Sequence, residues 1–185
     1  MTQLAKFAGF STDRLVMRDF TEQDLPAFAE YRNDPEIARY QSWDSYDMSK
    51  AKAFFETQQA LSFGEAGSWY QIAIADKQTN KLVGDCVIHF IEGDDKDQQV
   101  ELGFTLAGEN QGKGFAREGM SGLLEFIFND LNKRRIIAFV DALNKPAAAV
   151  LENAKFRQEA HFVENILFKG CWGSEYLYAL LKREF

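Results

Sequence analysis

The residues whose types and spacing could do chemistry gather in one glycine-rich loop. Gly108, Gly112 and Gly114 fall within seven residues, between a segment typical of a strand (99–106) and one typical of a helix. The first N–H groups of a helix have no partner inside the helix, and glycines let a ligand approach the backbone closely. Such loops usually bind anions, most often phosphates. We therefore expect a phosphate compound here, although an ordinary helix-capping loop would look similar.

Three phosphate-binding patterns compete for this loop. The P-loop G-x-x-x-x-G-K-[ST] fails because the spacing from Gly108 to Gly112 is one residue short and Gly114 replaces the metal-binding hydroxyl. The dinucleotide fingerprint G-x-G-x-x-G fails because Arg117 occupies the third glycine position. The third pattern, [QR]-x-x-G-x-[GA], matches completely. Its residues are Gln111, Gly112, Lys113, Gly114, Phe115 and Ala116.

Composition limits the class of protein. With 185 residues, of which 46% are hydrophobic, the chain predicts one packed domain over 1–185, with 1–10 as a loose N-terminal extension. A net charge of −7 argues against a nucleic-acid partner and mildly favours an amine substrate. The sequence has no membrane-length apolar run and no secretory signal, so we expect a cytoplasmic protein without membrane partners. Two distant cysteines and two isolated histidines predict no metal site.

The elements that position the loop follow from hydrophobic periodicity. The fold class is α/β or α+β: one mixed, mostly antiparallel, twisted sheet of about seven strands with flanking helices. The expected strands are 14–20, 68–76, 81–91, 99–106, 135–143, 160–168 and 174–182. After the loop, apolar residues at helical spacing predict a crossover helix, so strands 100–106 and 135–142 should pair in parallel as one central βαβ unit. Asn144 can cap the next helix.

Four motifs, in order, resemble the GNAT family of N-acetyltransferases, and most closely its branch that acetylates ribosomal-protein N-termini. The resemblance covers nearly the whole chain from about Ser11. Besides the glycine loop, the matching segments are RLVMRDFTEQD (14–24), VELGFTL (100–106), NKPAAAVLENAKF (144–156) and KGCWGSEYLYALLKREF (169–185).

The resemblance implies acetyl-CoA as cosubstrate and assigns residues to it. The pyrophosphate would lie on the backbone of Gln111–Ala116. The pantetheine arm would pair with the strand carrying Phe104, Thr105 and Leu106, where the family's sheet splays, and pass near Asn144 and Ala147. Glu101, on the same strand, is the candidate general base, commonly acting through water in this family.

The resemblance is weakest at the group that protonates the leaving thiolate. Many relatives have a Tyr seven residues after the capping Asn and others a Ser three residues after it, but here these positions hold Leu151 and Ala147. Tyr178 matches the family's terminal Tyr and is the candidate substitute acid. Departure of the thiolate without an enzymic acid is the alternative.

For the acceptor, the family's first two helices imply that Arg39, Tyr40 and Trp43 border the site, with Trp172 and the acidic loop 92–97 as further candidates. The prediction is an acetyl-CoA-dependent N-acetyltransferase that acts directly on a primary amine, either a protein N-terminus or a small molecule. The alternatives are a non-catalytic acyl-CoA-binding domain and an aminoglycoside-type acetyltransferase. The chain could be a monomer or a homodimer.

Overall fold

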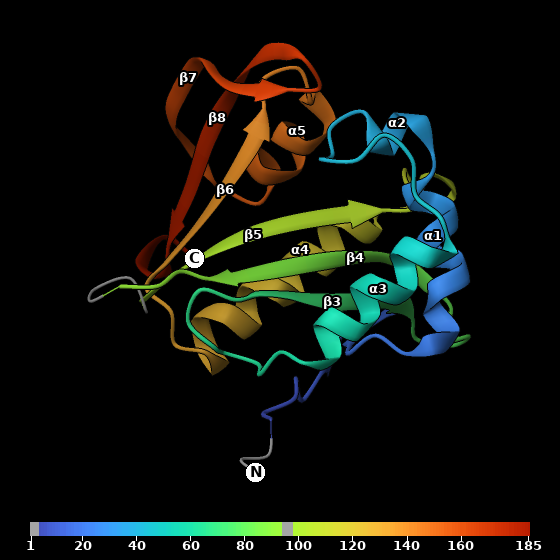
Figure 1. Cartoon of the computed structure of the whole chain (residues 1–185). Coiled ribbons are helices and arrows are strands. Elements are labelled where there is room, and N and C mark those ends of the chain that lie inside the picture. The colour runs from blue at the N-terminus through green and yellow to red at the C-terminus, as the bar shows by residue number, and fades with distance from the viewer. Residues whose placement is uncertain (1–3, 94–97) are drawn as a thin grey trace.

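The computed structural model describes residues 4–93 and 98–185, which form one eight-stranded sheet with helices on both faces (Figure 1). The strand order is β1-β2-β3-β4-β5-β6-β8-β7, and within it only β5 and β6 pair in parallel. The bounds are β1 Phe10–Ser11, β2 Leu15–Arg18, β3 Trp69–Asp76, β4 Leu82–Phe90, β5 Gln99–Leu106, β6 Arg135–Asp141, β7 Arg157–Phe168 and β8 Cys171–Leu181. The predicted mixed, mostly antiparallel sheet is confirmed, with one strand more than expected.

The extra strand is β1, which pairs with β2 through Phe10 and Ser11. It belongs to a stretch that was expected to be loose. Instead, Phe7 is 6% exposed and packs edge-on against the rings of Phe10 and Phe126. Phe7 and Phe10 therefore attach this extension to the domain, because these aromatic rings bury more apolar surface together than apart.

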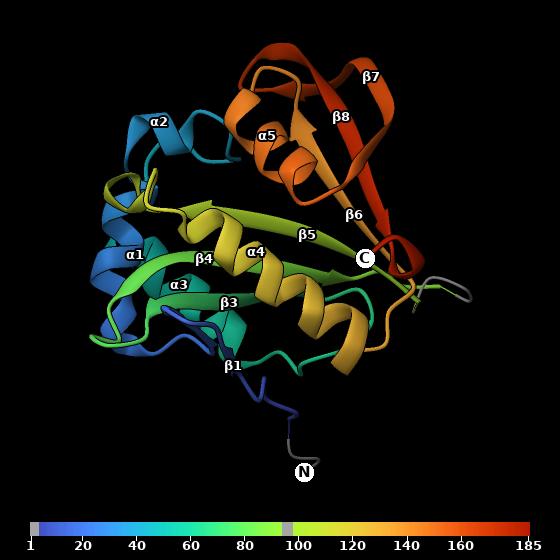
Figure 2. The ribbon, with the colours of Figure 1, turned by 180° about the vertical axis from the view of Figure 1, so that it is seen from behind.

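The helices are α1 Leu25–Arg32, α2 Pro35–Ala38, α3 Met48–Gln59, α4 Phe115–Glu125 and α5 Lys145–Asn153. Helices α1 and α3 cover one face of the sheet, and α4 and α5 cover the other (Figures 1 and 2). Three helix starts are capped by the side chains of Asp34, Asp47 and Asn144, which accept hydrogen bonds from backbone N–H groups of the first turn. The cap at Asn144 is the one that the sequence analysis predicts. No helix among the described residues is long and apolar enough to cross a membrane.

Helix α4 anchors the glycine loop to the core. Met120, Leu123, Leu124 and Ile127 are at most 2% exposed and pack against the central strands. The helix continues into a π-helical turn over Phe126–Asp130 before the chain enters β6. The start of α4 is therefore held at a fixed place beside the end of β5.

Strands β5 and β6 begin together and then diverge (Figure 1). Their parallel pairing is limited to Gln99–Glu101 against Arg135–Ile137. The expected pairing of 100–106 with 135–142 is right in direction, but Glu101 is the last paired residue of β5. The rest of β5 keeps its full ladder to β4 on the other side.

Candidate active site

The gap between β5 and β6 leaves backbone groups of β5 unpaired on that side. Two hydrogen bonds fix their direction: Arg134 N donates to the Gln98 carbonyl (2.8 Å) on the β6 side, and Ala107 N donates to the Val83 carbonyl (3.0 Å) on the β4 side. Because successive residues of a strand direct their N–H and C=O groups to alternate sides, the even-numbered residues of β5 face the gap. Beyond the last β6 pair these are Leu102, Phe104 and Leu106. An extended ligand can pair here as an added strand would.

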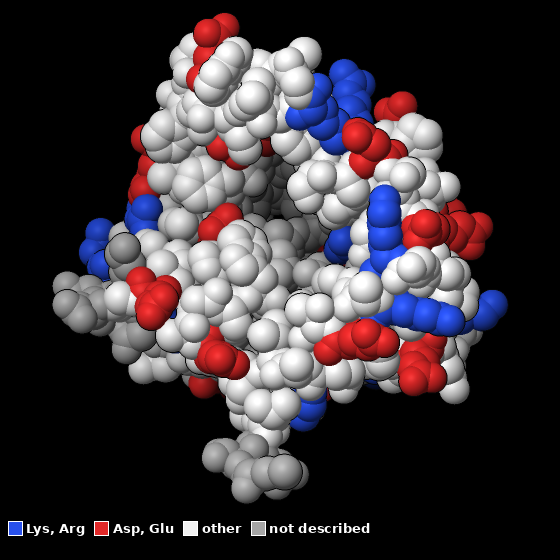
Figure 3. Space-filling view, viewed as in Figure 1, with Lys and Arg blue, Asp and Glu red and all other residues white. Residues whose placement is uncertain are grey.

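A cavity of about 510 Å³ lies at this gap and reaches both faces of the sheet. On the α4–α5 face it is lined by Phe104, Met120 and Ala147, and on the opposite face by Gln71, Asp85 and Glu101. In the space-filling view it appears as a hollow between the β6–β8 end of the sheet and α2 (Figure 3). A long thioester on one face and an acceptor on the other would therefore meet within the sheet.

The glycine loop lies between the end of β5 and the start of α4, outside the cavity lining, and Gly114 borders a separate groove. Gly112 and Gly114 have φ of 71° and 82°, the left-handed region in which glycine is favoured. Glu118 N is the first to bond back along the helix, to the Gly114 carbonyl (3.1 Å), so the N–H groups just before it are free for an anion. The Gln111 side chain donates to the Leu106 carbonyl (3.2 Å), which ties the loop to β5. Phe115 and Ala116, the first residues of α4, pack against the core.

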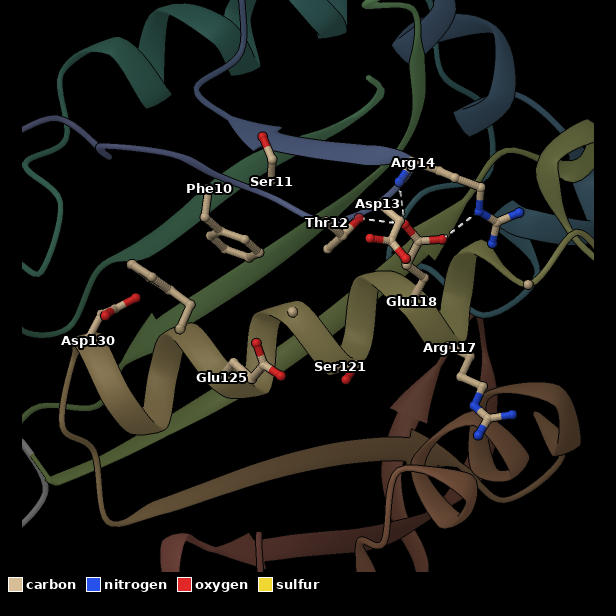
Figure 4. Close-up of a pocket in the computed structure, with 13 residues that line it drawn as sticks. Phe10, Ser11, Thr12, Asp13, Arg14, Arg117, Glu118, Ser121, Glu125 and Asp130 are labelled. Atoms are coloured by element: carbon tan, nitrogen blue, oxygen red, sulfur yellow. Dashed lines mark hydrogen bonds and ion pairs between the residues drawn. The ribbon is translucent and has the colours of Figure 1, made fainter. Parts of the chain in front are cut away.

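An ion pair between Arg14 and Glu118 holds the glycine loop against β2. Arg14 donates through Nε to Glu118 (2.6 Å) and through Nη1 to the Lys113 carbonyl (3.0 Å), and its guanidinium lies 4.6 Å from the Phe115 ring centre. Partial burial raises the pKa of the Glu118 carboxyl, but hydrogen bonds from Thr12 and Arg14 outweigh burial and lower it. These contacts edge a separate groove of about 640 Å³ along α4 (Figure 4). That groove does not include the strand gap, so we place the chemistry in the cavity.

Glu101 lies in the cavity wall at the point where β5 and β6 part. Its Oε2 is 3.2 Å from Nδ1 of His89, its direct neighbour on β4. His89 in turn stacks on Trp69 of β3, with ring centres 4.0 Å apart and planes 10° from parallel. The ladder Trp69–His89–Glu101 therefore holds the carboxylate in a fixed position facing the cavity.

A buried polar cluster lines the same face further along β4. Asp85 is 2% exposed and accepts hydrogen bonds from the Tyr31 hydroxyl, the Gln71 amide and Arg32 Nη2, the last at 3.1 Å. Burial raises the pKa of the Tyr31 hydroxyl, and the Asp85 charge raises it further. Burial lowers the pKa of the Arg32 guanidinium, but Asp85, Tyr31 and Tyr46 together outweigh burial and raise it. Arg32 and Asp85 both reach the cavity wall.

The residues predicted near the leaving thiolate are partly brought together. Ala147, Leu151 and Asn144 line the cavity, and Asn144 caps α5 by accepting from Ala147 N (3.2 Å). Tyr178 lies elsewhere: it is 1% exposed and its hydroxyl donates to Glu152 (2.8 Å). Burial and the Glu152 carboxylate raise the pKa of Tyr178 to about 12. This placement favours a structural tyrosine over the expected acid.

The predicted acceptor rim divides in the same way. Tyr40 and Trp43 line the cavity, whereas Arg39 is an exposed residue beside the Tyr40 ring and Trp172 is 64% exposed near the start of β8. The described part of the acidic loop, Glu92 and Gly93, is exposed, and 94–97 lie outside the described residues. Trp172 pairs with Leu167 across the hairpin, away from the cavity lining.

The β7–β8 turn reaches the rim through a lysine instead. Lys169 donates to the carbonyls of Ala38 (2.8 Å) and Trp43 (2.7 Å) and lies 3.1 Å from Asp44. The Tyr40 hydroxyl, after α2, donates a hydrogen bond to the carbonyl of Leu143, after β6 (3.4 Å). These contacts join the two sides of the splayed sheet across the mouth of the cavity.

Comparison with known proteins identifies the family. The family model of the acetyltransferase (GNAT) domain matches residues 14–157. The chain belongs to the GNAT acetyltransferase family. Over 175 residues it is 30% identical to the uncharacterized N-acetyltransferase p20 of Bacillus licheniformis, covering 94% of this chain and 96% of that one.

Two further relatives of this GNAT protein extend the comparison. A GNAT-family acetyltransferase from Bacillus anthracis superposes with a TM-score of 0.84 at 25% identity, covering 95% of this chain and 99% of that one. The spermidine N(1)-acetyltransferase of Vibrio cholerae is 32% identical over 100 residues, which is 54% of this chain and 56% of that protein. The prediction of an acetyltransferase is confirmed, and the family's donor is acetyl-CoA.

Sequence reasoning did not find His89, Arg32 or Asp85. A signal existed for the strand residues, because Asp85, Val87 and His89 alternate along one face of an otherwise apolar strand. The same face carries Glu101 on the neighbouring strand. Arg32 lies 53 residues from Asp85 in the chain, so no local pattern marks the pair.

Proposed function

We propose that this chain transfers the acetyl group of acetyl-CoA directly to a primary amine. The observation that carries the proposal is the cavity at the β5–β6 gap, where the backbone groups of Phe104 face the gap without a strand partner and Glu101 lies on the opposite face of the sheet. The glycine loop is tied to the end of the same strand by the hydrogen bond from Gln111 to the Leu106 carbonyl. The donor fits these residues: the loop offers free N–H groups for a pyrophosphate, and the gap offers a strand edge for an amide-containing arm.

Acetyl-CoA supplies an acetyl group activated as a thioester. Glu101 accepts the proton that the acceptor ammonium must lose before it can attack, directly or through a water molecule. The N–H group of Phe104, which faces the gap, donates a hydrogen bond to the acyl oxygen as negative charge develops there. The new bond joins the amine nitrogen to the acyl carbon, and the bond that breaks is the one from that carbon to sulfur.

A covalent enzyme intermediate is not needed. Cys86 is fully buried in β4, and burial and the adjacent Asp85 raise the pKa of its thiol, so it is a poor nucleophile. The lining near the expected sulfur position offers Ala147 and Leu151, which carry no acid. We propose that the thiolate leaves without an enzymic acid, because a thiol is a fair leaving group.

Among acceptors, the candidates are a peptide N-terminus, as in the ribosomal-protein branch, and a small amine. The Vibrio cholerae relative, a spermidine acetyltransferase, supports small amines within the wider family.

The first test is thermal unfolding with excess acetyl-CoA, with ATP and NAD as controls. Ligand at about 100 times its dissociation constant stabilises a fold by roughly 2.7 kcal/mol. For a chain of this size we expect Tm to rise by about 5–10 °C with acetyl-CoA alone. The second test is CoA release over a panel of amines. A Tm that responds to none of the three nucleotides, together with no CoA release, would refute the proposal.

A further inference from the structure

The arginine in the cavity wall is held with unusual rigidity. The Arg32 guanidinium lies over the ring of Phe28 at 4.2 Å and over that of Trp43 at 4.4 Å, with Tyr46 and Phe54 within 5.5 Å. Arg32 as a whole is 7% exposed. Rings stacked on a guanidinium leave hydrogen bonding to its edges, since all five donors lie in its plane. The side chain is therefore fixed in direction before any ligand arrives.

The cluster around Arg32 has more donors than acceptors. Arg32 Nη2 donates to Asp85, while the buried Nε has no hydrogen-bond partner among the described residues. Asp85 already accepts from Tyr31 and Gln71 as well, so its lone pairs are largely used. One shared carboxylate cannot satisfy five guanidinium donors. Because Arg32 lines the cavity, guanidinium donors that Asp85 does not use are available to an acceptor oxygen of a ligand there.

The position of the cluster limits the length of the ligand. Asp85 stands opposite Thr105 on β5, four residues from Glu101 and on the same face. At about 3.3 Å per residue, the two polar ends of the cavity are roughly 13 Å apart along the strand. A free α-amino acid is too short to span them. A polyamine is long enough, but it would place an ammonium group against the guanidinium.

We propose that Arg32 is an acceptor-binding residue that selects peptide N-termini, by donating hydrogen bonds to a backbone carbonyl oxygen of the acceptor within its first few residues. An extended peptide repeats a carbonyl every ~3.5 Å, so one whose amine is near Glu101 carries an oxygen to Arg32. This inference rests on the proposed transfer reaction at the same cavity. It adds to the proposed function the class of acceptor, a peptide N-terminus, and the residue that recognises it, Arg32.

The test compares three acceptors of the full-length protein with acetyl-CoA: the tetrapeptide amide Ser-Ala-Ala-Ala-NH₂, hexylamine and spermidine. Hexylamine is a primary amine, shorter than the peptide, with no oxygen for Arg32 to bind. We expect the wild-type protein to prefer the peptide in kcat/KM. In Arg32→Lys, which keeps the charge but loses the planar donors, the peptide kcat/KM should fall about 10- to 100-fold through KM, as for a hydrogen bond to a charged group. Hexylamine turnover should not change.

The matched control is Arg134→Lys, at an exposed arginine outside the cavity lining. It should leave all three acceptors unaffected. Equal losses for peptide and hexylamine in Arg32→Lys, or a wild-type preference for spermidine or hexylamine, would overturn the inference. If the Arg32 variant does not fold, the wild-type ranking still tests the class of acceptor.

A binding measurement separates this inference from the transfer reaction. Calorimetric titration of the same peptide into the CoA-saturated protein needs no turnover. One outcome is that no amine is acetylated, but the peptide binds and Arg32→Lys raises its dissociation constant about 10-fold or more. That result would refute the transfer reaction and support the peptide-binding site. If peptides are acetylated without dependence on Arg32, the reaction stands and this inference falls. A wild-type protein that neither binds nor acetylates the peptide would also overturn it.

Discussion

Replacing Gly84 by Ala should separate the two strands that form the floor of the active site. Gly84 stands opposite Leu106 in the β4–β5 ladder. A Cβ atom at Gly84 would lie 2.9 Å from Leu106 Cα and 2.8 Å from Leu106 Cδ2, and closer still to the Thr105 carbonyl oxygen. Carbon atoms in favourable contact are about 3.5–4.0 Å apart. The leucine methyl can rotate away, but the two backbone atoms cannot.

The loss of stability can be worked out from the difference between these distances and normal contact distances. Restoring contact to Leu106 Cα alone requires the strands to separate by about 0.6 Å, and more for the Thr105 oxygen. A shift of that size takes ladder hydrogen bonds from about 2.9 Å beyond the normal 3.2 Å limit. Two such bonds at about 1 kcal/mol each, plus overpacking of 1–3 kcal/mol, give roughly 3–5 kcal/mol. At 2–4 °C per kcal/mol, Tm should fall by about 6–20 °C.

The assay is thermal and urea unfolding of Gly84→Ala beside Gly173→Ala. Gly173 is also a strand glycine, but the nearest atom to a Cβ added there would be an Ile166 side-chain carbon at 3.4 Å, which is ordinary contact. That control should be within about 0.5 kcal/mol of the wild-type protein. Because Leu106 faces the ligand gap, Gly84→Ala should also weaken acetyl-CoA binding. A Gly84→Ala protein as stable as Gly173→Ala would refute the steric reasoning.

Three further predictions concern the base, the loop and an ion pair. Glu101→Gln should lower turnover by about 100- to 10,000-fold while the Tm shift with acetyl-CoA persists; unchanged turnover would remove Glu101 from the mechanism. Gly114 has φ 82°, and a Cβ added there would lie 3.3 Å from Arg14 Nη2. Gly114→Ala should therefore lower the free energy of unfolding by about 1–2 kcal/mol and weaken the binding of acetyl-CoA measured by calorimetry. An unchanged affinity for acetyl-CoA would argue against phosphate binding by the loop backbone. Hydrogen bonds, the strongest from Arg135, lower the pKa of Glu159 to about 2 from 4.5, so Glu159 stabilises the fold above pH 4.5 and that stability is lost as pH falls toward 2. Glu159→Gln should therefore be about 1 kcal/mol less stable at pH 7 by urea unfolding, with the difference shrinking toward pH 2; a constant difference would contradict this linkage.

The fold was predictable where local pattern and long-range packing agree. The stripe through Met120, Leu123 and Ile127 identified α4, and the continuous apolar run of 135–143 identified β6, because each pattern is periodic over many residues. The two-residue strand β1 could not be predicted this way. Its pairing depends on Phe7 and Phe10 meeting Phe126, which are more than 100 residues apart in the chain.

The parts of the candidate site that depend on local backbone conformation were predictable from the sequence. The parts that depend on the direction of strand side chains were less so. The glycine loop and the Asn144 cap follow from φ preferences and capping chemistry, which act locally. Trp172 and Tyr178 matched family positions, yet one is exposed on the hairpin turn and the other donates to Glu152 in the interior. The direction of a strand side chain depends on register, and β7 and β8 shift register twice.

The cavity receives side chains from both faces of one sheet, and this has a consequence for inhibition. The proposed donor half is bordered by Phe104 and Ala147 and the proposed acceptor half by Glu101 and Arg32, and all four residues line the same cavity. A single molecule that joins CoA through its sulfur to the N-terminus of a short peptide would occupy both halves at once. Its second half would bind at an effective concentration in the millimolar range or above, so its affinity should exceed that of either fragment by about 100-fold or more. Such a compound should compete with both substrates, each in its own half of the cavity.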